Sequence, residues 1–69
     1  MRDDELKALQ KTMRKAKRIA SEKAGALHDL VEDGLPGAYR DLPALAQETY
    51  DACKAWDEAR ATLDAAEKG

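Results

Sequence analysis

Apolar residues recur at alternating spacings of three and four on both sides of the break Gly34-Leu35-Pro36-Gly37. This spacing places apolar side chains on one face of an α-helix, whereas a half-buried strand shows strict alternation. The pattern predicts two amphipathic helices, over about residues 4–33 and 42–67, joined by a loop at about residues 34–41. Because a short connection makes consecutive helices antiparallel neighbours, the expected fold is an all-α two-helix hairpin, with one domain over residues 1–69.

The first expected helix carries its apolar residues along a single line. Asp3, Asp4 and Glu5 place negative charge at its start, where the helix dipole favours it. The line is interrupted by Lys23, and the poor helix former Gly25 is expected to allow the close approach of a neighbour. The line comprises Leu6, Leu9, Met13, Ala16, Ala20, Leu27 and Leu30.

The second expected helix continues the same pattern in an unbroken heptad register. Gly34 is expected to end the first helix in the left-handed conformation, and Asp41 to cap the second, with Pro43 in its first turn. In each heptad, two positions face the neighbouring helix. One of them is filled mostly by larger side chains and the other mostly by alanine, which favours close helix packing. The line comprises Leu42, Leu45, Thr49, Ala52, Trp56, Ala59, Leu63 and Ala66.

Length and composition indicate that the hairpin needs a second copy. A chain of 69 residues with fourteen alanines and no phenylalanine has little material for a core, and cores of this size contribute roughly 3–5 kcal/mol at most. A lone hairpin would leave much of its apolar surface in water, so a homodimeric four-helix bundle is expected. The predicted dimer core comprises Leu6, Leu9, Met13, Leu27, Leu30, Leu45, Trp56 and Leu63.

The single cysteine, Cys53, cannot form an internal disulfide, which fits a reducing compartment and predicts a cytoplasmic location. No stretch approaches the ~18 consecutive apolar residues of a membrane helix, and the charged N-terminus leads into no signal-peptide core. Neither membrane insertion nor secretion is expected. Cys53 is predicted to be a small buried hydrophobic residue beside Ala52, and Trp56 a core anchor.

Charge is distributed unevenly along the chain. Residues 1–24 contain eight basic and four acidic residues, whereas residues 25–69 contain four basic and ten acidic ones. One explanation is charge complementarity between the helices of the hairpin or dimer. The other is a polyanion-binding stripe, as RNA binding would require, made of Lys11, Arg14, Lys15, Lys17 and Arg18. The net charge of −2 and the lack of aromatic residues among these cations argue against nucleic acid.

The residues suited to chemistry are few. His28 and Glu32 lie one helical turn apart and could form a pair of ligands for a divalent transition metal, whereas Asp29 is expected to point elsewhere. Two ligands do not complete a site, and a surface histidine bonded to a nearby carboxylate is the alternative. The sequence shows no nucleophile arranged with a base and no phosphate-binding loop, so we predict no cofactor, no catalytic residue and no enzyme activity.

Several short motifs occur in a characteristic order. Each motif alone is weak evidence of relationship, and their combination and order are stronger evidence. They are Leu27-His28-Asp29-Leu30, then Leu35-Pro36, then Ala46 followed by Thr49-Tyr50. On these motifs the chain resembles, over roughly residues 20–66, the Rop-like family of small nitrogen-fixation proteins of unknown function. The resemblance implies a helical hairpin that pairs into a dimeric four-helix bundle, encoded near genes for nitrogenase and its iron–molybdenum cofactor. It transfers no catalytic residue.

Three functional hypotheses follow. The leading one is a non-enzymatic accessory protein of nitrogen fixation, a homodimer that binds nitrogenase or a cofactor-assembly protein. Its expected partner-binding residues are Leu27, His28, Asp29, Tyr39 and Tyr50. The alternatives are a metal or metallocluster carrier, using His28 and Glu32 with Cys53 as a further ligand, and RNA binding through the basic face of the first helix.

Overall fold

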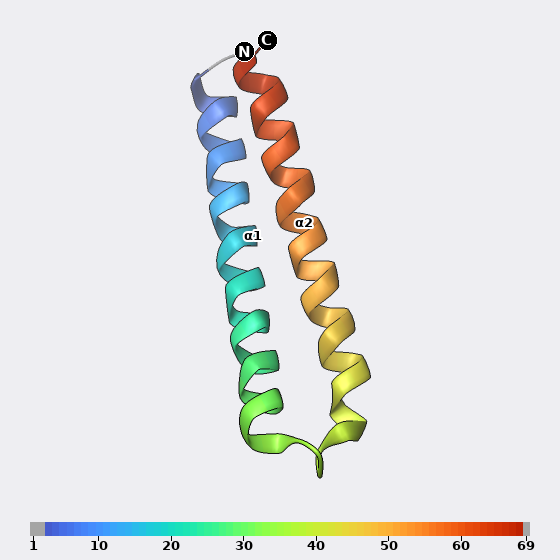
Figure 1. Cartoon of the computed structure of the whole chain (residues 1–69). Coiled ribbons are helices and arrows are strands. Elements are labelled where there is room, and N and C mark those ends of the chain that lie inside the picture. The colour runs from blue at the N-terminus through green and yellow to red at the C-terminus, as the bar shows by residue number, and fades with distance from the viewer. Residues whose placement is uncertain (1–2, 69) are drawn as a thin grey trace.

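The computed structural model describes residues 3–68 as two long antiparallel helices joined by a tight loop (Figure 1). Helix α1 spans Asp3–Asp29 and helix α2 spans Leu42–Lys68, 27 residues each. A π-helical turn, η1 (Leu30–Gly34), and a 3-10 turn, η2 (Tyr39–Asp41), lie between them. The molecule is a rod of 51 × 13 × 13 Å, which confirms the predicted hairpin. Neither helix has a stretch long and apolar enough to span a bilayer within residues 3–68.

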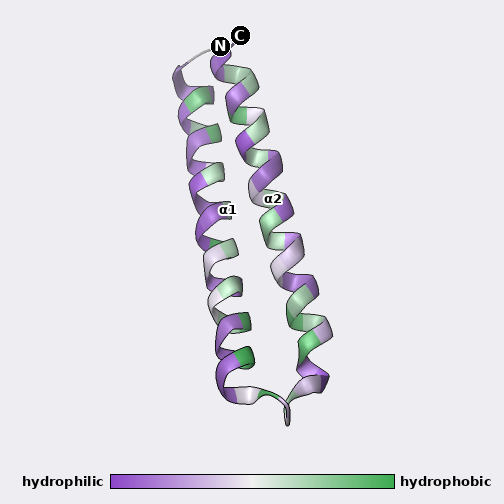
Figure 2. Cartoon of the chain, in the orientation of Figure 1, coloured by the Kyte–Doolittle hydropathy of each residue, from purple (hydrophilic) through white to green (hydrophobic). Residues whose placement is uncertain are grey.

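The two predicted apolar lines face each other along the whole rod. We call these positions the seam; Figure 2 shows the apolar segments of α1 recurring at its edge toward α2, with hydrophilic residues along the opposite edge. Within residues 3–68 only Leu63 is fully buried, at 6% exposure. All other seam residues, including Leu9, Met13 and Trp56, are half-buried. The heptad pattern is thus confirmed, although a single hairpin covers its own seam only in part.

A polar layer crosses the seam in the half of the rod nearer the loop. Lys23, which interrupts the apolar line of α1, places its Nζ atom 3.2 Å from the Glu48 carboxylate of α2. Beside it, the Thr49 hydroxyl donates to the Leu45 carbonyl oxygen at 2.8 Å and reaches the Lys23 carbonyl oxygen at 3.3 Å. Polar groups at seam positions fix the register of paired helices, because only one alignment satisfies them.

The helix ends differ from the prediction in two ways. Gly34 does not adopt the left-handed conformation; instead η1 closes with the Leu35 N–H donating to the Leu30 carbonyl oxygen at 3.0 Å. Gly34 is small for another reason, since a Cβ atom there would lie 2.7 Å from the Leu30 Cδ1 atom. Asp41 belongs to η2, which runs directly into α2, so it is not an isolated N-cap. Pro43 lies in the first turn of α2, as predicted.

Two small residues beside the seam lie outside the contact between α1 and α2, and the prediction of a buried Cys53 is wrong. Cys53 is exposed. It follows the seam residue Ala52, and successive side chains of an α-helix are rotated by about 100° around its axis. Gly25 has no neighbour in the hairpin, since a Cβ atom at this position would meet nothing within 4 Å. Neither residue therefore contributes to the contact between α1 and α2.

Candidate functional site

The loop end of the rod carries a small charged cluster around His28. The imidazole is 66% exposed in the last turn of α1, and its Nε2 atom lies 3.2 Å from the Glu32 carboxylate of η1. Its Nδ1 atom lies 3.8 Å from the Asp29 carboxylate, so Asp29 does not point elsewhere as the sequence suggested. The cluster therefore consists of one imidazole between two exposed carboxylates.

This cluster provides only part of a metal site. Zinc in a structural site takes four ligands, and catalytic sites supply three from the protein. Among residues 3–68, no three His, Cys, Asp or Glu side chains are grouped closely enough to hold a metal ion. Cys53 is thus not brought together with His28 and Glu32, and a single hairpin offers at most a two-ligand pair.

Three large apolar side chains are exposed within the described chain, all toward the loop end. Tyr39 is 59%, Tyr50 62% and Val31 53% exposed. The Arg40 guanidinium lies 5.8 Å from the centre of the Tyr39 ring, and its Nε atom donates to the Tyr39 hydroxyl at 3.5 Å. Val31 was not among the predicted partner-binding residues, although its position just outside the apolar line was a usable signal. Conversely, Leu27 is half-buried in the seam.

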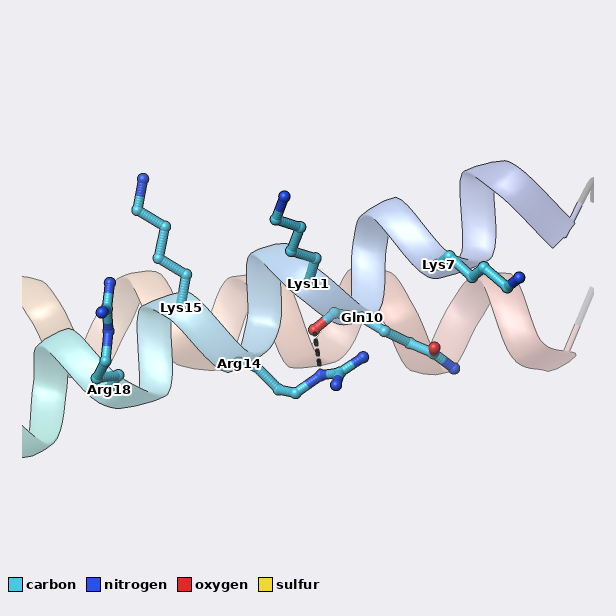
Figure 3. A pocket seen from close by; sticks show the side chains of 6 residues that line it. All are labelled: Lys7, Gln10, Lys11, Arg14, Lys15 and Arg18. Atoms are coloured by element: carbon cyan, nitrogen blue, oxygen red, sulfur yellow. Dashed lines mark hydrogen bonds between the residues drawn. The ribbon is translucent and has the colours of Figure 1, made fainter.

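A shallow groove runs along the N-terminal half of α1 (Figure 3). It lies on the side of α1 turned away from α2, and Figure 3 shows α2 passing behind it. The groove is lined by Lys7, Gln10, Lys11, Arg14, Lys15 and Arg18. We call its five cations the basic strip. It differs from the stripe expected from sequence by including Lys7 and excluding Lys17, which lines a hollow elsewhere.

Within residues 3–68, no side chain of the basic strip forms an ion pair. Even Glu22, one turn after Arg18, lies beyond ion-pair distance. The Arg14 Nε atom donates only to the Gln10 carbonyl oxygen, at 3.4 Å. Lys23–Glu48 is the one ion pair between α1 and α2 in the described residues, so charge complementarity within the hairpin is limited to this contact.

The cation Arg60 on α2 is bound quite differently. Its guanidinium lies 2.8 Å from the Asp57 carboxylate and 3.1 Å from the Asp64 carboxylate, one turn away on either side. The hydrogen bond and the negative charge of Asp57, helped by Asp64, raise the pKa of Arg60. The same guanidinium lies 5.6 Å from the centre of the Trp56 ring, a cation–π contact.

The seam is incomplete beside Trp56. A hollow there is lined by Lys17, Ala20, Ser21, Ala24, Cys53 and Trp56. The Trp56 Nε1 atom is buried but has no hydrogen-bond partner in the described part of the protein. A second small hollow, lined by Thr12, Lys15, Ala16, Ile19, Ala52 and Ala55, lies across the middle of both helices. The hollow leaves room for an additional group beside Trp56, and an acceptor placed there would remove the cost of the unsatisfied donor.

The comparisons with known proteins agree with this architecture. The sequence profile of the family described as Rop-like matches residues 4–68. No curated protein and no solved structure shows a significant match to the chain. The matched range includes both helices and the loop, and it extends further toward the N-terminus than the motifs around residues 20–66.

Proposed function

The chain belongs to the Rop-like family, and on that premise we propose that it is a homodimeric interaction module in which two hairpins form a four-helix bundle that binds a partner protein. The observation that carries this proposal is the half-buried seam, in which only Leu63 of the described residues is fully buried. Burying apolar surface is the main source of folding free energy. A second copy packed against the seam would supply the burial that one hairpin lacks.

We further propose that the partner is nitrogenase or a protein that assembles its cofactor. The support is the resemblance of the motifs around Leu27-His28-Asp29-Leu30 and Thr49-Tyr50 to those of nitrogen-fixation proteins. The exposed aromatic side chains of Tyr39 and Tyr50 are suited to protein recognition, because aromatic residues are enriched in interface cores. This proposal assigns no reaction to the chain, and it places the protein in the cytoplasm, where its unpaired cysteine would stay reduced.

Sedimentation equilibrium at micromolar concentration tests the dimer. The chain has a mass of 7.6 kDa, and the proposal requires a species of twice that mass. A well-folded species of 7.6 kDa at the same concentration would contradict it.

Affinity purification from nitrogen-fixing cells tests the partner. We expect the wild-type chain to recover nitrogenase-related proteins, and the double variant Tyr39→Ala/Tyr50→Ala to lose them. Glu58→Ala, an exposed change elsewhere on α2, is the matched control and should behave as wild type. Recovery of no nitrogenase-related protein under fixing conditions would remove the link to nitrogen fixation while leaving the dimer untouched.

A metal carrier is the second candidate, and the 3.2 Å contact between His28 and Glu32 favours it. Two copies that placed these pairs together would supply the four ligands of a tetrahedral site. Metal analysis of protein purified without a histidine tag decides the matter. The carrier proposal requires a stoichiometric metal that is lost in His28→Ala, and a metal-free wild-type protein would dispose of it.

A further inference from the structure

We propose that the basic strip of α1 is a docking site for an acidic helix on the partner protein. This inference rests on the proposed function, because it specifies the chemistry of the partner that the module binds. The strip consists of Lys7, Lys11, Arg14, Lys15 and Arg18, which line one continuous groove with Gln10 (Figure 3). Its charge is all of one sign.

The fold makes little use of the basic strip. The strip lies on the side of α1 turned away from the seam, and among its members only Lys15 also lines a hollow with residues of α2. Five pairs of its members lie three or four residues apart, from Lys7 with Lys11 to Lys15 with Arg18. Like charges at this spacing repel each other and destabilise a helix. Five cations concentrated in this way oppose the stability of a small protein, which indicates that they serve another purpose.

The rest of the chain shows that its cations can be paired. Arg60 contacts carboxylates on both neighbouring turns, and Lys23 contacts Glu48 across the seam. No member of the basic strip has such a contact within residues 3–68. The guanidinium and ammonium groups of the strip are therefore free to bind carboxylates from outside.

The dimensions of the groove fit a short helix. Lys7 and Arg18 are eleven residues apart, which corresponds to about 16 Å along an α-helix, or three turns. The aliphatic stems of lysine and arginine can cover apolar surface while their charged ends reach outward. An acidic helix with carboxylates on successive turns would present matching charges at the same spacing.

The observations favour a different protein as the occupant of the groove over a nucleic acid or a second copy of this chain. Single-stranded nucleic acid is bound by stacking its bases on aromatic side chains, whereas the groove contains no aromatic residue and the chain has a net charge of −2. A second copy bound at the strip would leave the seam uncovered, although the seam is where apolar burial is missing. Charge complementarity thus points to an acidic segment of a different protein.

Titration of the ¹⁵N-labelled chain of residues 1–69 with a synthetic helical peptide of about fourteen residues, four turns long, tests the proposal. The peptide carries glutamate on successive turns of one face, and a matched peptide carries glutamine instead. The glutamate peptide should shift the amide signals of residues 7–18, and the glutamine peptide should not. The shifts should weaken as salt is raised.

The matched variants separate the strip from general charge. The triple variant Lys11→Gln/Arg14→Gln/Arg18→Gln should lower the affinity for the glutamate peptide about tenfold or more, because it removes three of the cations that would pair with the peptide's carboxylates. The control Arg40→Gln/Lys54→Gln/Lys68→Gln removes the same number of exposed cations outside the strip. It should bind as wild type does, and an equal loss in both variants would overturn the proposal.

The remaining outcomes also decide. A short RNA hairpin that binds the strip more tightly than the glutamate peptide would assign the groove to nucleic acid instead. Dissociation of the dimer by the strip variant would show that a second copy occupies the groove. A wild-type dimer that binds neither probe would overturn this inference and leave the proposed function standing, whereas a folded monomer would overturn the proposed function whatever the peptide does.

Discussion

Helices α1 and α2 have the same length but use their side chains differently. Helix α2 supplies Leu63, the one fully buried residue among residues 3–68, and ties Arg60 to Asp57 and Asp64. Helix α1 supplies the basic strip, whose cations have no carboxylate partner in the described chain. The difference teaches that the two helices have different roles: α2 holds the best-buried side chain and a paired cation, whereas the outer face of α1 keeps like charges that repel one another.

The largest expected effect is at Leu63. Leu63→Ala should lower the free energy of unfolding by about 2–4 kcal/mol, because it removes buried methyl groups and leaves a cavity. Urea denaturation followed by circular dichroism measures it. For a protein this small, such a loss is a large fraction of the total stability.

Val31→Ala is the matched control for this change on the α1 side of the loop. Val31 is 53% exposed in the hairpin, so its truncation should cost well under half as much as Leu63→Ala. An equal cost at both positions would contradict the comparison, since it would mean that a second copy covers Val31 as completely as α2 covers Leu63.

The second effect has the opposite sign and lies on α1. Lys11→Gln/Arg14→Gln/Arg18→Gln should raise the free energy of unfolding by about 1 kcal/mol, because it removes the like-charge pairs between successive turns while keeping helix propensity. Thermal melts at low and high salt measure it, and added salt should shrink the difference. A strip variant less stable than wild type would show that these cations are paired in solution and would reverse the contrast between the helices.

The seam could be predicted from sequence, because heptad spacing alone determines which residues of two antiparallel helices face each other. The interruption at Lys23 was visible too, but its partner Glu48 was not, since the axial alignment of α1 and α2 depends on the loop. The position of the loop was predicted, but its conformation was not. The Leu35 N–H closes a π-helical turn on the Leu30 carbonyl oxygen, and a Cβ atom at Gly34 would lie 2.7 Å from the Leu30 Cδ1 atom; the general preference of glycine for the left-handed conformation reveals neither contact.

The candidate site was predicted less completely than the fold. The pairing of His28 with Glu32 followed from helical spacing, whereas the contact of His28 with Asp29 depends on side-chain rotation. Sequence placed Lys17 in the basic stripe, yet Lys17 lies on the flank toward Trp56. Which cations share a groove depends on how α1 is rotated about its axis relative to α2. Counting charges along the sequence does not give this rotation.

Glycine provides the third test. Gly25→Ala should raise the free energy of unfolding by about 0.5–1 kcal/mol, because alanine is the better helix former and its Cβ atom would meet nothing within 4 Å. Gly34→Ala is the control: its Cβ atom would lie 2.7 Å from the Leu30 Cδ1 atom, so it should destabilise the loop end. Denaturant midpoints of both variants measure the contrast. A destabilising Gly25→Ala would indicate that a second copy packs closely at this position on α1.

The smallest effect is at Arg60, the α2 counterpart of the basic strip. Arg60→Gln breaks the contacts to Asp57 and Asp64 and leaves two carboxylates without a cation, so the melting temperature should fall slightly. The fall should diminish with added salt. Because these contacts raise the pKa of Arg60, its contribution to stability is constant across neutral pH and is lost only in strong base. Salt rather than pH is therefore the discriminating variable. The comparison between the helices requires opposite signs: removing cations destabilises α2 at Arg60 and stabilises α1 at the basic strip, and two shifts of the same sign would abolish it.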